Sequence, residues 1–408
     1  MNLFKTLVAA AAVTFAVPTF AAEEAGAFKV PGTETTLKFN GFAETALFYQ
    51  FHGGFEFLYT GCDYYICPSA IALDGQHVNN WQTAMTVAYS RFGVQSSTPT
   101  PVGVAGTRFE VDAAKGYQLE GQTFTHSSFI RIRHAYGTVG DTFLMGQTWS
   151  TFADLNTFPD QMDENPFFNL AALRAPMIRV GFPVGGAKLT FALEDAYFTS
   201  LTGNKPPEQA FWNVPDFIAR LDFGSGPASL SLRGVVKQYR TQSASTAGGG
   251  GAVGAAIKFG NDTLVADVSG GPGIGTYVYG ATINPTGGLA QDAFQTNANT
   301  ITTWKVWGAS AGYTHVWTPA VRSNLMASGI WTSSNSDIQN AVIAGPAAGR
   351  AAYDLSNKQV YSVGVNTYWQ PAKIFWIGLE GYYNYRKNFA DAHGDEWRAE
   401  LVGHFNLL

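Results

Sequence analysis

From about residue 35 to its end, the chain repeats one pattern, in which runs of alternating apolar and polar residues are separated by turns. A period of two predicts β-strands that have one apolar face and one wet face. The runs predict about sixteen strands, beginning near residues 35, 79, 104, 128, 141, 174, 187, 212, 227, 251, 262, 302, 320, 356, 372 and 395.

The connections between these runs alternate between short and long. The short ones have Gly, Pro or Asp in positions suited to tight turns and lie at 96–103, 140–141, 183–186, 224–227, 260–262, 318–320 and 370–372. The long ones include 52–77, 150–173, 271–301 and 334–355. Short turns at one end and long loops at the other are typical of outer-membrane barrels, and about sixteen strands enclose an aqueous channel.

The first 21 residues are typical of a secretory signal peptide. Lys5 is followed by an apolar core over 6–17 and by a small-residue cleavage site that ends at Ala21. A transmembrane anchor is the alternative, but it needs roughly twenty apolar residues and finds about a dozen. No later run reaches that length, so a spanning structure has to be a closed barrel. We therefore expect a signal peptide at 1–21, a short segment at 22–34 and a transmembrane β-barrel at 35–408.

Composition supports an all-β fold. Charged residues make up 13% of the chain, which has 45 Gly, 30 Phe, 18 Tyr and 10 Trp. A soluble β-sandwich would also alternate, but aromatic residues next to turns, such as Phe182, Trp317 and Trp369, favour a membrane girdle. The sequence leaves open which face of the strand at 305–317 meets lipid. A net charge of −5 offers no basic surface for nucleic acid.

Motifs for catalysis and for metal binding are weak. Ser310 fits G-x-S-x-G but lies inside a predicted strand, and Gly249 to Gly254 fit G-x-G-x-x-G in what we expect to be a flexible external loop. Cys62 and Cys67 are expected to form a disulfide, because an exported chain meets an oxidising compartment. A metal site at these cysteines, with His52 and His77, is the weaker alternative. We expect no enzyme, no metal and no cofactor.

Arg131 and Arg133 lie two residues apart between isoleucines, and so project from one face of a strand. An arginine on the lipid face near mid-membrane costs roughly 2 to 4 kcal/mol, whereas the cost in a wet lumen is small. The pair therefore predicts a lumen-facing side, with Ile130, Ile132, His134 and Tyr136 outward. Three further basic residues are expected on the same lumen wall, namely Arg91, Arg108 and Arg179. Guanidinium groups bind carboxylate or phosphate through two hydrogen bonds, so this wall would favour anions.

The connection at 150–173 combines acidic with aromatic residues. Its acids are Asp154, Asp160, Asp163 and Glu164, and its aromatic residues include Phe152, Phe158, Phe167 and Phe168. Such a loop could fold inward and narrow the pore, with its acids facing the basic wall. The alternative is an external loop that covers the rim.

Five segments together resemble the DcaP-like porins of Gram-negative outer membranes. They are FKVPGTETTLKFNGF (28–42), SRFGVQSSTPTP (90–101), FIRIRHAYGTVG (129–140), MGQTWSTFAD (145–154) and APMIRV (175–180). The resemblance implies a sixteen-stranded homotrimer, passage of small anions such as dicarboxylates and aromatic acids, and a third loop that constricts the channel. Two departures are a leader segment shorter than the helical one of some members and a terminal Leu408 in place of an aromatic residue.

Together these features predict an outer-membrane porin, embedded in the lipid bilayer, for diffusion of small, preferentially anionic solutes. A substrate-specific channel for one organic or aromatic acid is an alternative, in which Trp149, Phe152 and Phe158 would form a binding step. A secreted soluble β-protein or adhesin is another.

Overall fold

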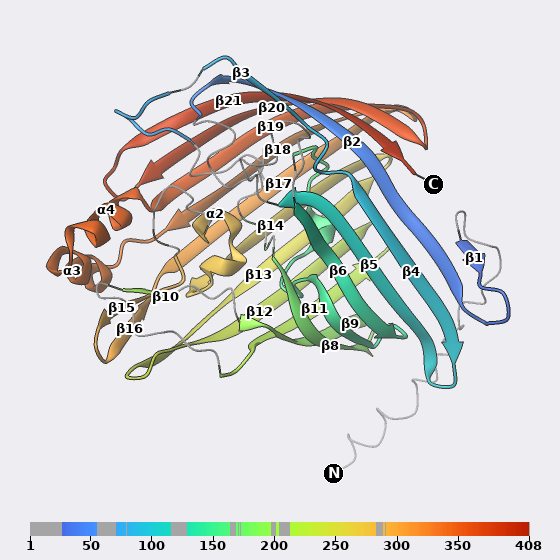
Figure 1. The fold of residues 1–408 in the computed structure, drawn as a ribbon, viewed down its shortest axis with the longest axis horizontal. Helices are drawn as coiled ribbons and strands as arrows, with labels where there is room; N and C mark the ends of the chain where they lie inside the picture. Colours follow the sequence, from blue (N-terminus) through green and yellow to red (C-terminus); the bar gives the residue numbers. More distant parts are fainter. Residues whose placement is uncertain are drawn as a thin grey trace, which may run out of the picture.

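The computed structural model describes residues 27–54, 71–78, 80–115, 129–163, 169, 171, 173–196, 201–203, 213–282, 289 and 291–407. These residues form a closed, antiparallel barrel of 16 strands, in which each strand pairs with the next along the chain. The last strand pairs with β2, which closes the barrel (Figure 1). The predicted all-β barrel is confirmed.

The observed strands begin close to the predicted positions. β2 (Thr36–His52) pairs with both β3 (Gln82–Thr86) and β4 (Arg91–Thr100), which share one place in the barrel. The others are β5 (Gly103–Lys115), β6 (Phe129–Val139), β7 (Phe143–Trp149), β8 (Arg174–Val184), β9 (Ala187–Glu194), β11 (Asp216–Ser225), β12 (Ala228–Arg240), β13 (Ser245–Phe259), β14 (Asp262–Pro272), β17 (Lys305–Thr318), β18 (Val321–Thr332), β19 (Asn357–Ala372), β20 (Phe375–Asn388) and β21 (His393–Asn406).

The largest shift is at β13, which begins at Ser245 and so includes the glycines that we expected in a flexible loop. All of these glycines pair with β12, and Gly251 and Gly254 also pair with β14. A Cβ added to Gly250 would lie 2.5 Å from the carbonyl oxygen of Gly270. Close approach of the neighbouring backbone therefore explains glycine at this position.

The two ends of the barrel differ in their connections (Figure 1). Short turns join strand pairs such as β4 to β5 and β8 to β9 at the end that we call the turn end. At the opposite loop end lie α2 (Tyr279–Thr282), α3 (Ser336–Ala344), α4 (Ala347–Leu355) and a small sheet of β10 (Leu201–Gly203), β15 (Ala293–Asn297) and β16 (Thr300–Thr303). β1 (Ala27–Lys29) pairs with the start of β2. Among the described residues, no helix is long and apolar enough to cross a bilayer.

Exposure separates the two faces of the strands. Ile130, Ile132, Trp317 and Trp369 are exposed on the outside, as expected for a lipid-facing belt. On β17, whose orientation the sequence left open, Trp307 is also exposed, while the alternate residues are buried. The aromatic face of β17 is therefore its outer face.

A β-bulge changes the orientation of β6 after Arg133. Glu110 of β5 pairs with His134, whereas the next residue of β5, Val111, pairs with Ile132, so that Arg133 is an extra residue on β6. His134 is consequently buried, with its Nδ1 atom 2.9 Å from the Thr148 hydroxyl oxygen. The prediction that His134 and Tyr136 point outward was wrong, because a strict period of two does not continue through a bulge.

Candidate functional site

Three of the predicted arginines meet two acids on the inner face of β5 and β6. Nε and Nη2 of Arg131 donate to the two carboxylate oxygens of Asp112, at 2.9 and 2.7 Å. Arg133 donates to Glu110 at 2.9 Å and to Asp112 at 2.7 Å, and Arg108 donates to Glu110 at 2.7 Å. The arginines thus outnumber the acids that they bind.

A cavity of about 400 Å³ lies beside this cluster. Its basic lining residues are Lys38, Arg91, Arg108 and Arg133, whereas Glu110 is the acid among the residues that line it. The aromatic side chains of Phe42 and Trp149 complete its wall, and the guanidinium carbon of Arg91 lies 5.1 Å from the centre of the Phe42 ring. We call this cavity the basic pocket.

Arg174, the first residue of β8, was missed in the sequence because it stands where the long connection ends. Its guanidinium carbon lies 3.6 Å from the centre of the Trp149 ring, which is a close cation–π stack. Arg133, Arg131 and Arg91 are near enough to repel its charge. We define the basic wall as Arg91, Arg108, Arg131, Arg133 and Arg174.

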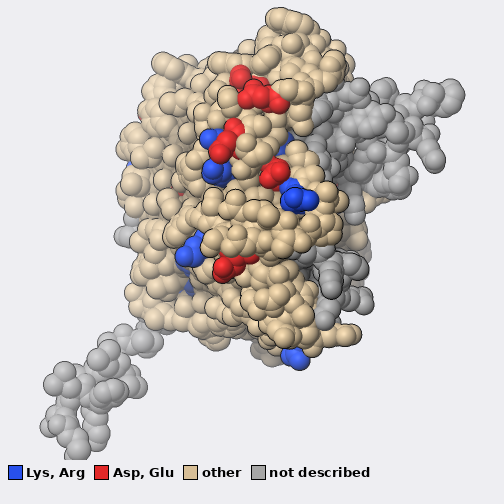
Figure 2. All heavy atoms as spheres, turned by 90° about the vertical axis from the view of Figure 1, so that its left-hand side faces the viewer, with Lys and Arg blue, Asp and Glu red and all other residues tan. Residues whose placement is uncertain are grey.

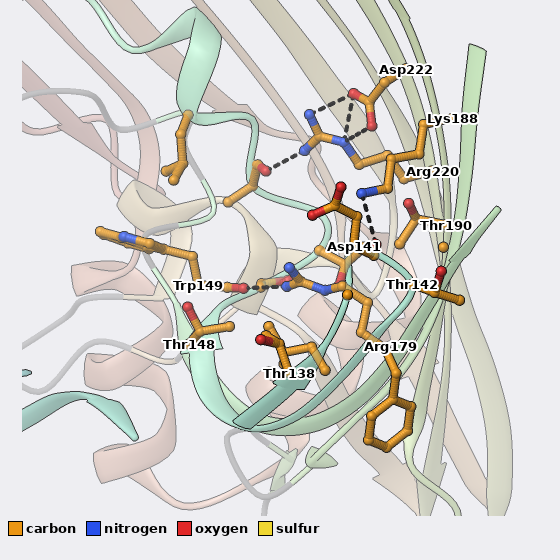
Figure 3. A pocket seen from close by; sticks show the side chains of 18 of the residues that line it. Thr138, Asp141, Thr142, Thr148, Trp149, Arg179, Lys188, Thr190, Arg220 and Asp222 are labelled. Carbon is orange, nitrogen blue, oxygen red and sulfur yellow. Dashed lines mark hydrogen bonds and ion pairs between the residues drawn. The ribbon is translucent and has the colours of Figure 1, made fainter. Parts of the chain in front are cut away.

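Arg179, which was predicted to belong with these arginines, lines a second cavity of about 480 Å³ (Figure 3). Its Nε donates to the Thr151 hydroxyl at 2.9 Å and its Nη2 to the Trp149 carbonyl at 2.7 Å. Arg179 therefore supports the start of the long connection after β7. Lys188 and Arg220 line the same cavity, together with several threonines.

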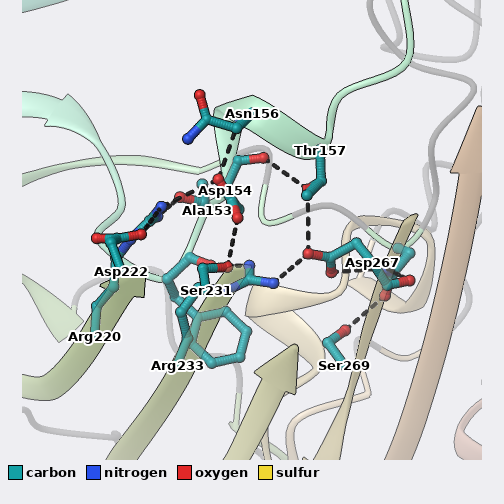
Figure 4. A network of polar contacts seen from close by, with 12 residues as sticks. Ala153, Asp154, Asn156, Thr157, Arg220, Asp222, Ser231, Arg233, Asp267 and Ser269 are labelled. Carbon is teal, nitrogen blue, oxygen red and sulfur yellow. Dashed lines mark hydrogen bonds and ion pairs between the residues drawn. The ribbon is translucent and has the colours of Figure 1, made fainter. Parts of the chain in front are cut away.

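The connection after β7 contacts the inner faces of β11, β12 and β14 (Figure 4). Asp154 accepts hydrogen bonds from Arg220 at 3.0 Å and from the Ser231 hydroxyl, and it caps the short helix η2 (Leu155–Thr157). Thr157 and Asn169 donate to Asp267, at 3.2 and 3.1 Å. These bonds attach the first part of the connection to the barrel wall.

Further along, the same connection is attached to β18, β20 and β21. The backbone amides of Met162 and Asp163 donate to the Glu380 carboxylate, at 2.9 and 2.8 Å. Asp160 binds Arg322 at 2.5 Å, and the Asp163 carboxylate lies 3.8 Å from Arg398. Asp154, Asp160 and Asp163, the described acids of the connection, thus lie against arginines of β11, β18 and β21.

Inward-facing glycines make room for this connection. A Cβ on Gly312 would lie 2.5 Å from Cβ of Pro159, and a Cβ on Gly308 would lie 2.3 Å from Oδ1 of Asn169. Both glycines belong to β17, so the small residues on its inner face are explained by the segment that packs on them. We call Pro159, Asn169 and these two glycines the glycine seat.

The aromatic residues of the connection have different surroundings. Phe152 is 1% exposed and packs against Tyr277, with ring centres 5.3 Å apart, so its ring offers no face to a passing solute. Phe158 is partly buried and lies 6.0 Å from Trp149. Trp149 is thus the aromatic residue of the predicted binding step that borders a cavity.

Asp154 lies outside the membrane-spanning strands, and its environment keeps it ionised. Burial is the largest effect on its pKa and raises it, but Arg220, the Ser231 hydroxyl, Arg233 and the Asn156 amide together lower the pKa below its ordinary value. The carboxylate therefore persists at neutral pH as the acceptor that holds the connection.

The sequence matches the profile of the DcaP outer membrane protein family over residues 29–407. The chain belongs to this family. A search of curated proteins finds no relative. The prediction of DcaP-type porin character is confirmed, as is the bacterial outer-membrane location, which rules out a secreted soluble adhesin.

Solved structures show that the DcaP-family barrel has the porin fold. The outer membrane channel DcaP of Acinetobacter baumannii has a TM-score of 0.75 at 23% identity, covering 93% of this chain and 99% of that one. An anion-selective porin from Comamonas acidovorans has a TM-score of 0.56 at 11% identity, covering 92% and 100%. The trimer form of OmpT from Vibrio cholerae has a TM-score of 0.51 at 8% identity, covering 91% and 99%.

Some predictions for this DcaP-family channel lie outside the described residues. They are the signal peptide at 1–21, the Cys62–Cys67 disulfide, and the positions of Glu164, Phe167 and Phe168. Figure 2 shows the loop end of the channel, where acidic and basic side chains lie beside each other on a mostly uncharged described surface. The accumulation of basic groups is thus a property of the interior and not of this face.

Proposed function

We propose that this DcaP-family channel conducts small, preferentially anionic solutes, such as organic acids and dicarboxylates, through a water-filled lumen. The observation that carries the proposal is the basic wall with its adjoining pocket, in which five arginines are accompanied by the carboxylates of Glu110 and Asp112. An excess of fixed positive charge on a pore wall favours anions over cations. The anion selectivity named for the Comamonas porin is consistent with this use of the fold.

We further propose that the connection at 150–173 narrows the lumen. Its bonds to β11, β12 and β14 at one part and to β18, β20 and β21 at another support an inward course. The glycine seat supports it as well, because glycine on the inner face of β17 removes the side chains that would occupy the same space.

A homotrimer is the expected assembly. The support comes from OmpT of Vibrio cholerae, whose solved structures include a trimer form. Detergent-extracted protein should migrate as a trimer before heating. Migration as a monomer under mild detergent would contradict this part of the proposal.

The proposed selectivity is tested with the purified protein in a planar lipid bilayer under a potassium chloride gradient. The reversal potential should have the sign that corresponds to a chloride permeability greater than that of potassium. A reversal potential of the opposite sign would show a cation-selective pore and would overturn the anion preference, while leaving the porin fold unaffected.

A further inference from the structure

Arg174 differs from Arg131 and Arg133 of the basic wall in its hydrogen bonding. Within the described part of the chain, its Nε and Nη2 atoms are buried and have no hydrogen-bond acceptor. By contrast, Arg131 holds both oxygens of Asp112, and Arg133 bridges Asp112 and Glu110. A buried guanidinium whose donors are unused is costly, so such a group favours an acceptor that comes from elsewhere.

The charges around Arg174 point the same way. Arg133, Arg131 and Arg91 repel it, and Asp112 is the acid that attracts it. The carboxylate oxygens of Asp112 already accept hydrogen bonds from Arg131 and Arg133. The local field therefore favours an additional anion beside Arg174.

The stack on Trp149 determines which donors of Arg174 are available. The indole covers one face of the planar guanidinium at 3.6 Å, whereas Nε and Nη2 lie along one edge of it. Two donors on one edge of a guanidinium match the spacing of two oxygens in a carboxylate or a phosphate. A spherical halide has no second oxygen with which to use this arrangement.

The basic pocket borders Trp149, the residue on which Arg174 stacks. It shares the Trp149 ring as part of its wall and contains Lys38, Arg91, Arg108 and Arg133. An anion in this pocket is therefore within the field of several basic groups before it meets Arg174. Since Nε and Nη2 are enclosed, the Arg174 side chain has to turn towards the pocket to present its edge.

We propose that Arg174 and the basic pocket form a saturable binding site for a small oxyanion, either a carboxylate or inorganic phosphate, which accepts two hydrogen bonds from the Nε and Nη2 edge of Arg174. This inference rests on the proposed anion channel, and it adds a preference for oxyanions over halides. A solute would pause at the basic pocket during passage.

The test is a measurement of chloride current through the channel in a planar bilayer while phosphate or acetate is added at constant ionic strength. The wild-type current should fall with added oxyanion and reach a plateau, and added bromide should give no such saturation. The Arg174→Lys variant keeps the charge but lacks the two-donor edge, so its apparent affinity for the oxyanion should be about tenfold lower. Saturation with phosphate alone, or with acetate alone, would assign the site to that source.

The matched control is Arg386→Lys. Arg386 is also an inward arginine, but its edge is occupied, because Nε donates to the Asn357 side chain at 2.7 Å and Nη2 to the Leu355 carbonyl at 2.6 Å. Its replacement should leave the apparent oxyanion affinity unchanged. Equal affinities in wild type and Arg174→Lys, or a wild-type current that shows no saturation, would overturn the site. An anion-selective reversal potential measured in the same membranes would then leave the proposed channel function standing, whereas a cation-selective one would overturn the function itself.

Discussion

Two inner walls of the barrel differ in the balance of their charges and in how far these charges are covered. On β5 and β6, Arg108 and Arg131 remain partly exposed beside a cavity. On β20 and β21, Glu380, Glu396 and Glu400 are each buried. The connection at 150–173 lies against the acidic side, where two of its amides bind Glu380.

The difference teaches that the charge met by a solute in the pore depends on which inner wall the connection at 150–173 covers. It does not follow from the net charge of the whole chain. The sequence has a net charge of −5, yet the charged residues that line the cavity beside β5 and β6 are mainly basic. Asp154 and Asp160 of the connection are themselves paired with Arg220 and Arg322. Many of the negative charges of the interior are thereby occupied.

Reversing charges on the basic wall should have the largest effect, and that effect is on ion selectivity. Arg108 and Arg131 are the suitable pair, because their side chains are 33% and 27% exposed, whereas Arg133 is buried among acids. The double variant Arg108→Glu with Arg131→Glu should lower the chloride-to-potassium permeability ratio by roughly tenfold, a change of about 1.4 kcal/mol. The reversal potential in a salt gradient measures it.

The control for this double variant is Lys258→Glu, at an exposed position near the turn after β13. Its reversal potential should stay close to that of the wild type. An unchanged ratio in the Arg108 and Arg131 double variant would show that the basic wall does not determine selectivity.

Removing Glu380, which holds the connection at 150–173 against β20, should have the next largest effect, and that effect is on the conductance. Glu380→Ala removes the acceptor of the Met162 and Asp163 amides and of the Asn366 side chain. Each hydrogen bond contributes about 1 kcal/mol net, and an amide left unsatisfied costs about 1 to 3 kcal/mol. We expect a higher and noisier single-channel conductance. A conductance equal to that of the wild type would contradict an inward position for this segment.

Adding a side chain at the glycine seat should have a smaller effect on the conductance. Gly312→Val places side-chain atoms where Pro159 now packs, and overpacking of this kind costs about 1 to 3 kcal/mol. The segment should shift, so that the conductance changes while the barrel stays folded. Ala311→Val is the matched control, because Ala311 is the exposed neighbour on the outer face of β17. Equal conductance in the two variants would argue against the seat.

The effect of Asp154 protonation on the conductance should be the smallest of these effects near neutral pH. The pKa of Asp154 is below its ordinary value of about 3.9, so the stabilisation that it provides is complete above that value and is lost as the pH falls through the lowered pKa. The part of the conductance that depends on Asp154 should therefore be constant from pH 7 to 5 and change only below about pH 4. In Asp154→Asn, this acid-induced change should be absent. A change between pH 7 and 5 that Asp154→Asn removes would contradict the lowered pKa.

The strands could be predicted from the sequence because alternation is a local property of the chain. The starts of β8 and β9 agree with the predicted residues, and Arg131 lies on the inner face as expected. His134 was placed on the wrong face, since the bulge at Arg133 has no signature in the alternation.

The partners of the connection could not be predicted, because they are far away in the sequence. Nothing near Asp154 or Asp160 indicates Arg220 or Arg322 as the partner. Arg174 was missed for a related reason, since its role depends on Trp149 at the other end of the same connection. The glycines of β17 were the one available signal, because an inner face of small residues leaves space for a packed segment.

The closure of the barrel has a consequence for its biogenesis. β21 pairs with β2, so the hydrogen-bonded ring is completed only when the last strand of the barrel reaches the first. Until then β2 and β21 each have an open edge, and such edges invite pairing with other chains. Their contacts are also the most distant in the sequence and so the slowest to form. An assembly factor that holds these two edges would shorten the period in which the chain is vulnerable to aggregation.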